Sequence, residues 1–206
     1  MLADDKNIGR SLFLHSCCAP CSSYVLTYLS SFFDITVFYF NPNITSDAEY
    51  THRVLEQKRL IQNLNEERFK YPWACNELPH REIKVIDLDH ETQRFYDIAK
   101  GFEEEKEGGA RCVRCFRLRL EETAKYAVLN KADYFGTTLT ISPLKNAQVI
   151  NNIGYQIEKE VYIKWLPSDF KKKEGYKHSI ELSAKFDLYR QNFCGCEYSH
   201  QTPETM

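Results

Sequence analysis

Seven of the eight cysteines in this 206-residue sequence fall into three short clusters. The first cluster is a C-C-x-x-C motif, the second a C-x-x-C motif and the third a C-x-C motif. Cysteine makes up only about 4% of the chain, too little for a disulfide scaffold, so clustered thiols point to metal or redox chemistry. The clusters are Cys17, Cys18 and Cys21, then Cys112 and Cys115, then Cys194 and Cys196, while Cys75 stands alone.

Several kinds of site are compatible with these thiols. Four thiolates suffice for an iron–sulfur cluster. A structural zinc site also takes at most four cysteines, which leaves three clustered thiols without a role. Thiols beyond the first four can bind a second metal, or they can alternate between dithiol and disulfide and so store two electrons. The residues alone leave these possibilities open.

The first cluster stands between two expected elements. Residues 11–15 form a short apolar run that predicts a buried strand, and an apolar helix follows to about residue 31. The N-terminus of a helix favours anions, so we expect lowered thiol pKa values there. Ligands of open α/β sheets bind at the carboxyl ends of the strands, where this cluster stands. The sequence has neither of the glycine-rich nucleotide-binding motifs, G-x-x-x-x-G-K-S/T and G-x-G-x-x-G. Cysteines therefore stand where a nucleotide-binding relative would hold phosphate.

Strands alternate with helices along the rest of the chain, which predicts an α/β fold with a mostly parallel, doubly wound sheet. Ser46 and Glu49 form a capping box at the start of one helix. With no repeat or linker, residues 1–206 are expected to form a single catalytic domain, ordered over about 11–199 with a frayed C-terminal tail. The other expected strands span 35–40, 83–88, 133–138 and 162–166, and the other expected helices span 46–65, a segment ending at 102, 112–131 and 179–186.

Composition narrows the class of protein. The chain is 43% hydrophobic and 27% charged, which excludes a disordered chain, a collagen-like repeat and a coiled coil. No apolar run approaches the ~20 residues of a membrane span. Acidic residues near the start replace the bases of an export signal, so we expect a cytoplasmic protein. The net charge of −2 means that any contact with nucleic acid depends on local basic patches.

Four separated motifs, taken in order, resemble the QueH family of epoxyqueuosine reductases over about residues 11–199. They are H-S-C-C-A-P-C-S at 15–22, N-P-N-I at 41–44 followed by Glu49 and Tyr50, the C-x-x-C pair, and Y-R-Q-N-F-C-G-C at 189–196. The resemblance implies an iron–sulfur enzyme, unrelated to the cobalamin-dependent type. It also implies a fold akin to the adenine-nucleotide α-hydrolases, the HUP-like fold. The implied reaction reduces the epoxide of epoxyqueuosine, at the wobble base of tRNA, to the alkene of queuosine.

The resemblance also implies roles for the cysteines. Cys194 and Cys196 are expected to be a redox-active pair that forms an easily reduced disulfide. A competing allocation uses two cysteines with Asp169 to hold a second iron beside the cluster. Cys21 has no assigned role apart from that second iron, and Cys75 is expected to be a packed thiol. The expected ligands of a 4Fe–4S cluster are Cys17, Cys18, Cys112 and Cys115.

The expected reaction takes two electrons and two protons, and the epoxide oxygen leaves as water. An external electron donor is therefore required. Asp169, His15 and Tyr39 are candidate proton donors, although His15 can equally be structural and Asp169 can equally cap a helix. An iron with an open position can act as a Lewis acid on the epoxide oxygen.

A tRNA substrate requires phosphate contacts. Two basic clusters bracket the cysteine motifs and are candidate RNA-facing surfaces. Tyr39 or Tyr189 can stack on the target base once it has left its own stack. Residues 137–139 and 142–145 can bind substrate hydroxyls or phosphate, or can form a plain turn. The basic clusters consist of Arg111, Arg114, Arg117 and Arg119, and of Lys171, Lys172, Lys173, Lys177 and Lys185.

Two alternative functions remain open from the sequence. A cluster-dependent tRNA-thiolating enzyme of the same fold would use ATP, but the S-G-G-x-D-S pyrophosphate loop of that class is missing. The other alternative is a non-catalytic zinc module that binds RNA. Iron and sulfide in the purified protein would exclude the zinc module, and tRNA-dependent ATP hydrolysis would favour thiolation.

Overall fold

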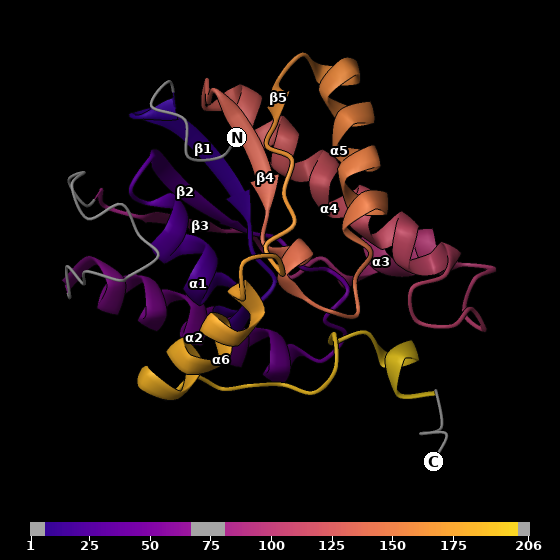
Figure 1. The fold of residues 1–206 in the computed structure, drawn as a ribbon. Helices are drawn as coiled ribbons and strands as arrows, with labels where there is room; N and C mark the ends of the chain where they lie inside the picture. Colours follow the sequence, from indigo (N-terminus) through magenta and orange to yellow (C-terminus); the bar gives the residue numbers. More distant parts are fainter. Residues whose placement is uncertain (1–6, 67–80, 202–206) are drawn as a thin grey trace.

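The computed structural model describes residues 7–66 and 81–201, whose core is a five-stranded sheet (Figure 1). The order of the strands is β3-β2-β1-β4-β5, and every neighbouring pair is parallel. The predicted doubly wound α/β fold is therefore confirmed. Cys75 lies outside the described residues. The strands are β1 (Arg10–His15), β2 (Phe33–Tyr39), β3 (Lys84–Asp87), β4 (Tyr134–Thr137) and β5 (Lys164–Trp165).

Helices cover both faces of the sheet (Figure 1). They are α1 (Ala19–Leu29), α2 (Asp47–Glu66), α3 (Thr92–Ala99), α4 (Ala110–Leu129), α5 (Ala147–Val161) and α6 (Gly175–Lys185), with short 3₁₀ helices η2 (Leu139–Ile141) and η3 (Glu197–Gln201). On one face α1 packs against α2 and α6, and on the other α4 packs against α3 and α5. The segment after α6 then runs past α2 to the side of α3 and α4 (Figure 1).

Strand β1 lies at the centre of the sheet and is buried on both faces. Its side chains alternate between the two cores: Leu12 and Leu14 pack under α1, whereas Phe13 packs under α4. The chain crosses to β2 and β3 on one side of β1 and to β4 and β5 on the other. The carboxyl end of β1 is therefore the topological switch point, where ligands of such sheets bind.

Helix α5 was not predicted from the sequence. Its apolar residues recur at helical spacing, with Ile150, Ile153 and Ile157 buried, but isoleucine has a modest helix propensity. The Asn146 side chain caps the helix by accepting hydrogen bonds from two backbone N–H groups. Gly154 packs directly against the Trp165 ring, which leaves no room for a side chain. Tertiary packing and the cap therefore define this helix more than local propensity does.

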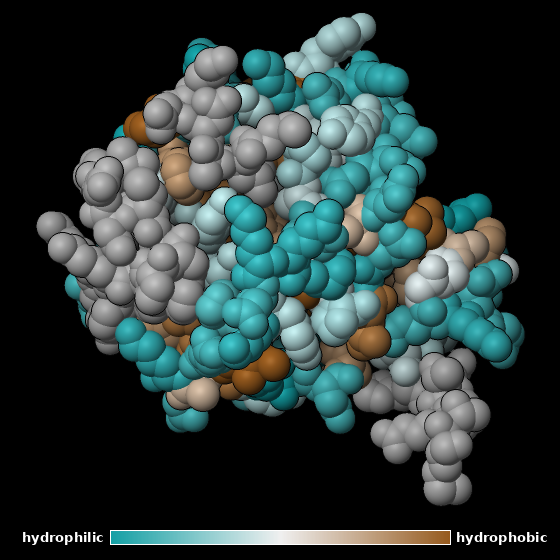
Figure 2. All heavy atoms as spheres, in the orientation of Figure 1, coloured by the Kyte–Doolittle hydropathy of each residue, from teal (hydrophilic) through white to brown (hydrophobic). Residues whose placement is uncertain are grey.

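The surface formed by the described residues is mostly polar, in agreement with the composition of the chain. The face drawn in Figure 2 is mostly hydrophilic, and its hydrophobic residues lie in small separate patches. Among the described helices, none combines the length and apolar character needed to cross a bilayer.

Candidate functional site

The three cysteine clusters meet at one cavity of about 350 Å³. The cavity is lined by residues that follow the carboxyl ends of β1, β2 and β4, where the topology predicts a ligand site. Polar and charged side chains from α2, α4 and the C-terminal segment complete the lining. All seven cysteines of the described residues contribute: Cys17, Cys18, Cys21, Cys112, Cys115, Cys194 and Cys196.

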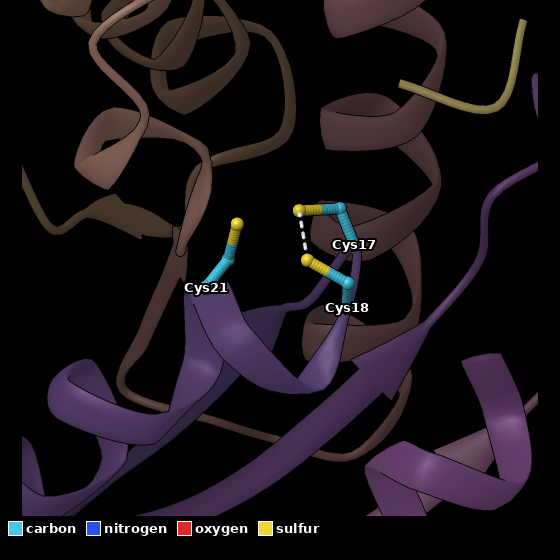
Figure 3. Close-up of side chains that lie close together, drawn as sticks. All are labelled: Cys17, Cys18 and Cys21. Atoms are coloured by element: carbon cyan, nitrogen blue, oxygen red, sulfur yellow. Dashed lines mark hydrogen bonds between the residues drawn. The ribbon is translucent and has the colours of Figure 1, made fainter. Parts of the chain in front are cut away.

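The first cluster is gathered by the turn from β1 into α1. Cys18 is the N-cap of the helix and Cys21 lies in its first turn, so their sulfurs and that of Cys17 point toward one another (Figure 3). The three Sγ atoms all lie within 4.8 Å of one another, and those of Cys17 and Cys18 are 3.8 Å apart. This spacing suits three ligands of one metal ion. Pro20 in the first turn fixes the helical start of the backbone.

Ionisation is divided unequally within this triplet. Hydrogen bonds from Cys18 and Cys21 hold the pKa of Cys17 well below its usual range. The same hydrogen bonding raises the pKa of Cys18 to about 12 and also raises that of Cys21. The expected lowering of thiol pKa values therefore holds for Cys17 only, because three thiols this close cannot all ionise without a cation.

The second and third clusters form a neighbouring group of thiols. Cys112 lies in the first turn of α4, and the Gly108 N–H donates to its sulfur over 3.2 Å. One turn later, Cys115 packs in a small core with Cys196. Burial raises the pKa of Cys112, and it raises that of Cys115 to about 11.

In the C-x-C pair, Cys194 has the lower pKa. A hydrogen bond from Cys196 lowers the pKa of Cys194 and raises that of Cys196. Both are free thiols in the structure. Cys194 is therefore the thiol of the pair that ionises first.

Groups from α2 and from the loop after β2 hold the C-x-C segment in place. Arg53, only 2% exposed, pairs with Glu49 at 2.6 Å and donates to the Cys194 carbonyl over 3.2 Å. The Asn43 amide donates to the same carbonyl over 3.4 Å. The backbone N–H of Thr45 donates to the next carbonyl along the chain, over 3.1 Å. The segment is thus fixed by contacts about 150 residues distant in sequence.

Positive charge surrounds the thiols. Arg119 is only 3% exposed and donates to the Cys115 carbonyl and the Asn41 side chain, but no carboxylate of the described residues forms an ion pair with it. Lys145 also lines the cavity. Burial disfavours its charged form, yet the nearby thiols of Cys17, Cys21 and Cys194 raise its pKa overall. Because a buried charge is costly unless paired, these cations make the cavity a favourable place for thiolates or another anion.

The expected proton donors do not line the cavity. Asp169 forms an ion pair with Lys171 at 3.1 Å. His15 shares a hydrogen bond of 2.9 Å with the Thr137 hydroxyl, and burial lowers its pKa to about 3, so it is neutral. The Tyr39 hydroxyl donates to the Cys17 carbonyl over 3.4 Å, and burial raises its pKa. Besides the thiols, Lys145 and the cavity-lining Glu107 are better placed to supply a proton.

Two of the four arginines in the predicted basic cluster on α4 are buried and so cannot contact RNA from the surface. Arg111 is buried and donates to the carbonyls of Phe102, Glu103 and Glu105, and Arg119 is buried as well. Arg117 pairs with Glu121 and Glu160, and Arg114 is exposed over the Phe102 ring. In the second cluster, Lys172 and Lys173 are exposed. Tyr189, a predicted stacking residue, hydrogen-bonds Glu49 and stacks on His52.

Sequence reasoning did not single out three residues that line the cavity: Asn43, Arg53 and Glu107. Asn43 stands in the N-P-N motif, and Arg53 follows Glu49 at the i,i+4 spacing of a helical ion pair. Both residues could therefore have been identified from the sequence. Glu107 ends a charged run that predicts only a solvated loop. Burial raises its pKa beside the cavity, which no local pattern reveals.

Comparisons with known proteins show which family the chain is similar to. The family model described as epoxyqueuosine reductase QueH matches residues 12–202. Epoxyqueuosine reductase QueH of Staphylococcus epidermidis is 40% identical over 190 residues, which cover 91% of this chain and 75% of that protein. The Streptococcus pyogenes protein of the same name is 39% identical over 95% of this chain and 72% of its own length. The Thermotoga maritima protein is 33% identical over 92% of this chain and 90% of its own length.

Proposed function

The chain belongs to the QueH family of epoxyqueuosine reductases, and from this we propose that it reduces the epoxide of epoxyqueuosine in tRNA to the alkene of queuosine. The observation that carries the proposal is the convergence of three cysteine clusters on one cavity. In this oxidoreductase reaction both carbon–oxygen bonds of the epoxide break and the oxygen leaves as water. The site must therefore supply two electrons and two protons.

We propose that four of the thiols hold a 4Fe–4S cluster. Cys17 and Cys18 come from the turn between β1 and α1, and Cys112 and Cys115 come from α4. Thiolates are the usual ligands of such clusters, and a bound cluster delivers electrons one at a time. The buried charge of Arg119 and the ammonium of Lys145 support this proposal, because a thiolate-bound cluster supplies the negative charge that they lack.

A second iron is a further part of the proposal. Cys21 is its better-supported ligand, since its sulfur lies in the metal-sized triplet. Asp169 is not among the residues that line the cavity, and its carboxylate already pairs with Lys171. A role for Asp169 at this iron would require it to leave that ion pair.

Cys194 and Cys196 are proposed as the direct source of the two electrons. When the two thiols form a disulfide, each loses one hydrogen atom, and together these balance the conversion of epoxide to alkene and water. The lower pKa of Cys194 makes it the more reactive thiol. Lys145 and Glu107 are proposed to relay protons to the departing oxygen. An external electron donor then returns the disulfide to the dithiol.

The substrate places further demands on the site. A wobble base must leave its stack to enter the cavity, and Lys145 and Arg190 in the lining offer positive charge to the RNA backbone. We also infer a cytoplasmic location, where tRNA is modified and thiols stay reduced.

The test is anaerobic incubation of the iron-loaded protein with epoxyqueuosine-containing tRNA and a strong reductant, followed by mass analysis of the nucleosides. The expected product has lost one oxygen atom, and the reaction needs no ATP. The Cys194→Ala variant is the matched control and should leave the epoxide intact. Iron-loaded wild-type protein that leaves the epoxide unchanged would refute the proposed reaction, and a strict need for ATP would favour thiolation instead.

A further inference from the structure

The N-P-N motif contains two buried asparagines, Asn41 and Asn43, whose side-chain amides differ in how many of their hydrogen-bonding groups have a partner. Asn41, 1% exposed, donates to the Ser16 carbonyl over 2.8 Å and accepts from Arg119 over 3.3 Å, so both ends of its amide are partnered. Asn43, 3% exposed, donates to the Cys194 carbonyl, and its Oδ1 has no hydrogen-bond partner. Only Asn43 lines the cavity.

The orientation of the Asn43 amide follows from its one bond. A carbonyl oxygen can only accept, so the atom facing Cys194 must be Nδ2, and the other end must be the oxygen. A buried acceptor without a donor is unfavourable and is rare in folded proteins. Because Asn43 lines the cavity, the missing donor belongs to whatever binds there.

The surroundings define what kind of donor fits. Arg53, Arg119, Lys145 and Arg190 line the cavity together with Arg111, whereas Glu107 is the only carboxylate among the described residues of the lining. The nearby Arg53 already pairs with Glu49 and donates to the Cys194 carbonyl, so it does not supply the missing donor. The amide oxygen is neutral, and it can accept a hydrogen bond from an uncharged hydroxyl group.

We propose that Asn43 is a substrate-binding residue whose Oδ1 accepts a hydrogen bond from a hydroxyl on the ring that carries the epoxide. The proposal rests on the proposed function. The same amide bonds the Cys194 carbonyl, so a hydroxyl held at Oδ1 is held beside the segment that carries the reactive thiol. Asn43 thus positions the substrate ring next to the C-x-C pair.

A purely structural role for Asn43 is separable from this binding role. The Cys194 carbonyl also receives a hydrogen bond from Arg53 over 3.2 Å, shorter than the bond from Asn43, and therefore keeps a donor when Asn43 is replaced. Asn43→Ala removes the acceptor and the donor together. Asn43→Asp keeps an acceptor oxygen but loses the N–H donor. The two variants thus separate the proposed role from support of the segment.

The experiment measures binding, so it needs no turnover. The iron-loaded protein is titrated anaerobically with tRNA carrying queuosine, which retains the ring hydroxyls, and with the same tRNA carrying guanosine at the wobble position. The wild type should bind the queuosine RNA more tightly. Asn43→Ala should reduce this preference roughly 10- to 100-fold, the range for one hydrogen bond to a buried polar group. Asn43→Asp should keep most of it.

Asn41→Ala serves as the control from the same loop, because both ends of its amide are bonded to protein groups and the residue does not itself line the cavity. This variant should lower the melting temperature and leave the ratio of the two affinities unchanged. The inference is overturned if Asn43→Ala keeps the wild-type ratio, or if Asn43→Asp loses as much as Asn43→Ala. A wild type with no preference between the two RNAs would instead contradict the proposed function itself. Should Asn43→Ala fail to fold, Asn43→Ser also removes the long-reaching acceptor and carries the same expectation.

Discussion

The two ends of the chain bring cysteines to the same cavity by different means. The triplet at residues 17–21 is placed by regular structure, because it occupies the turn between the central strand β1 and the first turn of α1. The C-x-C pair belongs to no helix or strand. Groups from elsewhere in the chain hold it: the Arg53 side chain from α2, and the Asn43 side chain and the Thr45 backbone N–H from the loop after β2.

This difference separates a rigid part of the site from an adjustable one. A turn between two packed elements has few alternative conformations, so it suits ligands that hold a cluster. A segment held by a few hydrogen bonds can move by small amounts as thiols form and break a disulfide. We therefore expect changes in the first region to affect metal content, and changes in the second to affect turnover.

Cysteine substitution should produce the largest effects and the clearest contrast between the regions. Cys17→Ala is expected to lose most of the bound iron and all reductase activity, because a cluster ligand is gone. Cys194→Ala should keep most of the iron and lose turnover. Iron content and absorbance of anaerobically purified protein, together with the nucleoside assay, measure both. Equal loss of iron in the two variants would contradict the proposed division of roles.

Arg53 donates hydrogen bonds to the C-x-C segment and to the residue before it, and we call these bonds the clamp. Removing the clamp should have the next largest effect. Arg53→Met removes the donors to the Cys194 and Phe193 carbonyls, and a small misplacement of reacting groups can lower the rate roughly 100-fold. Alkylation of Cys194 should also change in rate, while iron content should not. Breaking a buried ion pair can cost about 3–5 kcal/mol, so the double variant Glu49→Gln with Arg53→Met avoids an orphaned carboxylate.

Arg59→Met is the matched control for the clamp. Arg59 lies on the same helix, pairs with Glu56 and donates to the carbonyls of Phe186 and Asp187, outside the C-x-C segment. The Arg59→Met variant should be slightly less stable than wild type, and the alkylation rate of Cys194 should not change. If both arginine variants alter Cys194 equally, the clamp is not specific.

A substitution between the two thiols should have a smaller effect. Gly195 has a φ of +98°, and an added Cβ would lie 2.8 Å from the Ile44 side chain. Gly195→Ala should therefore shift the segment and reduce turnover roughly 10-fold while iron stays bound. Gly101→Ala provides the comparison, since its φ is +82° but nothing lies within 4 Å of the added carbon. A similar loss of turnover in both variants would attribute the effect to backbone strain alone.

The smallest effect is expected at the opposite end of β1. The Asp133 carboxylate accepts hydrogen bonds from the Ser11 backbone and hydroxyl, and these, with Arg10, lower its pKa below 3.8. A lowered carboxyl pKa adds stability above about pH 4, and that contribution is lost as the pH falls below it. Asp133→Asn should thus be slightly less stable than wild type at pH 7 and equally stable in strong acid, with normal iron content. Thermal unfolding at several pH values tests this.

The sequence was most informative where local pattern determines structure. Apolar strands, the first cysteine motif and its place at a helix start follow from short-range spacing, and the structure confirms them. Helix α5 escaped prediction because its stability comes from packing on Trp165 and from the Asn146 cap. The arginines of α4 looked like a phosphate-binding run, but burial of Arg111 and Arg119 depends on contacts with distant segments. The clamp on the C-x-C segment is equally non-local.

The central claim is that separated thiols share one metal centre, and iron and sulfide analysis of Cys112→Ser against wild type tests it most directly. Wild-type protein purified without oxygen should contain at least about four iron and four sulfide per chain, as a 4Fe–4S cluster requires. Cys112→Ser should lose most of both although the triplet at 17–21 is intact. Zinc in place of iron in the wild type, or full retention of iron and sulfide in Cys112→Ser, would contradict the claim.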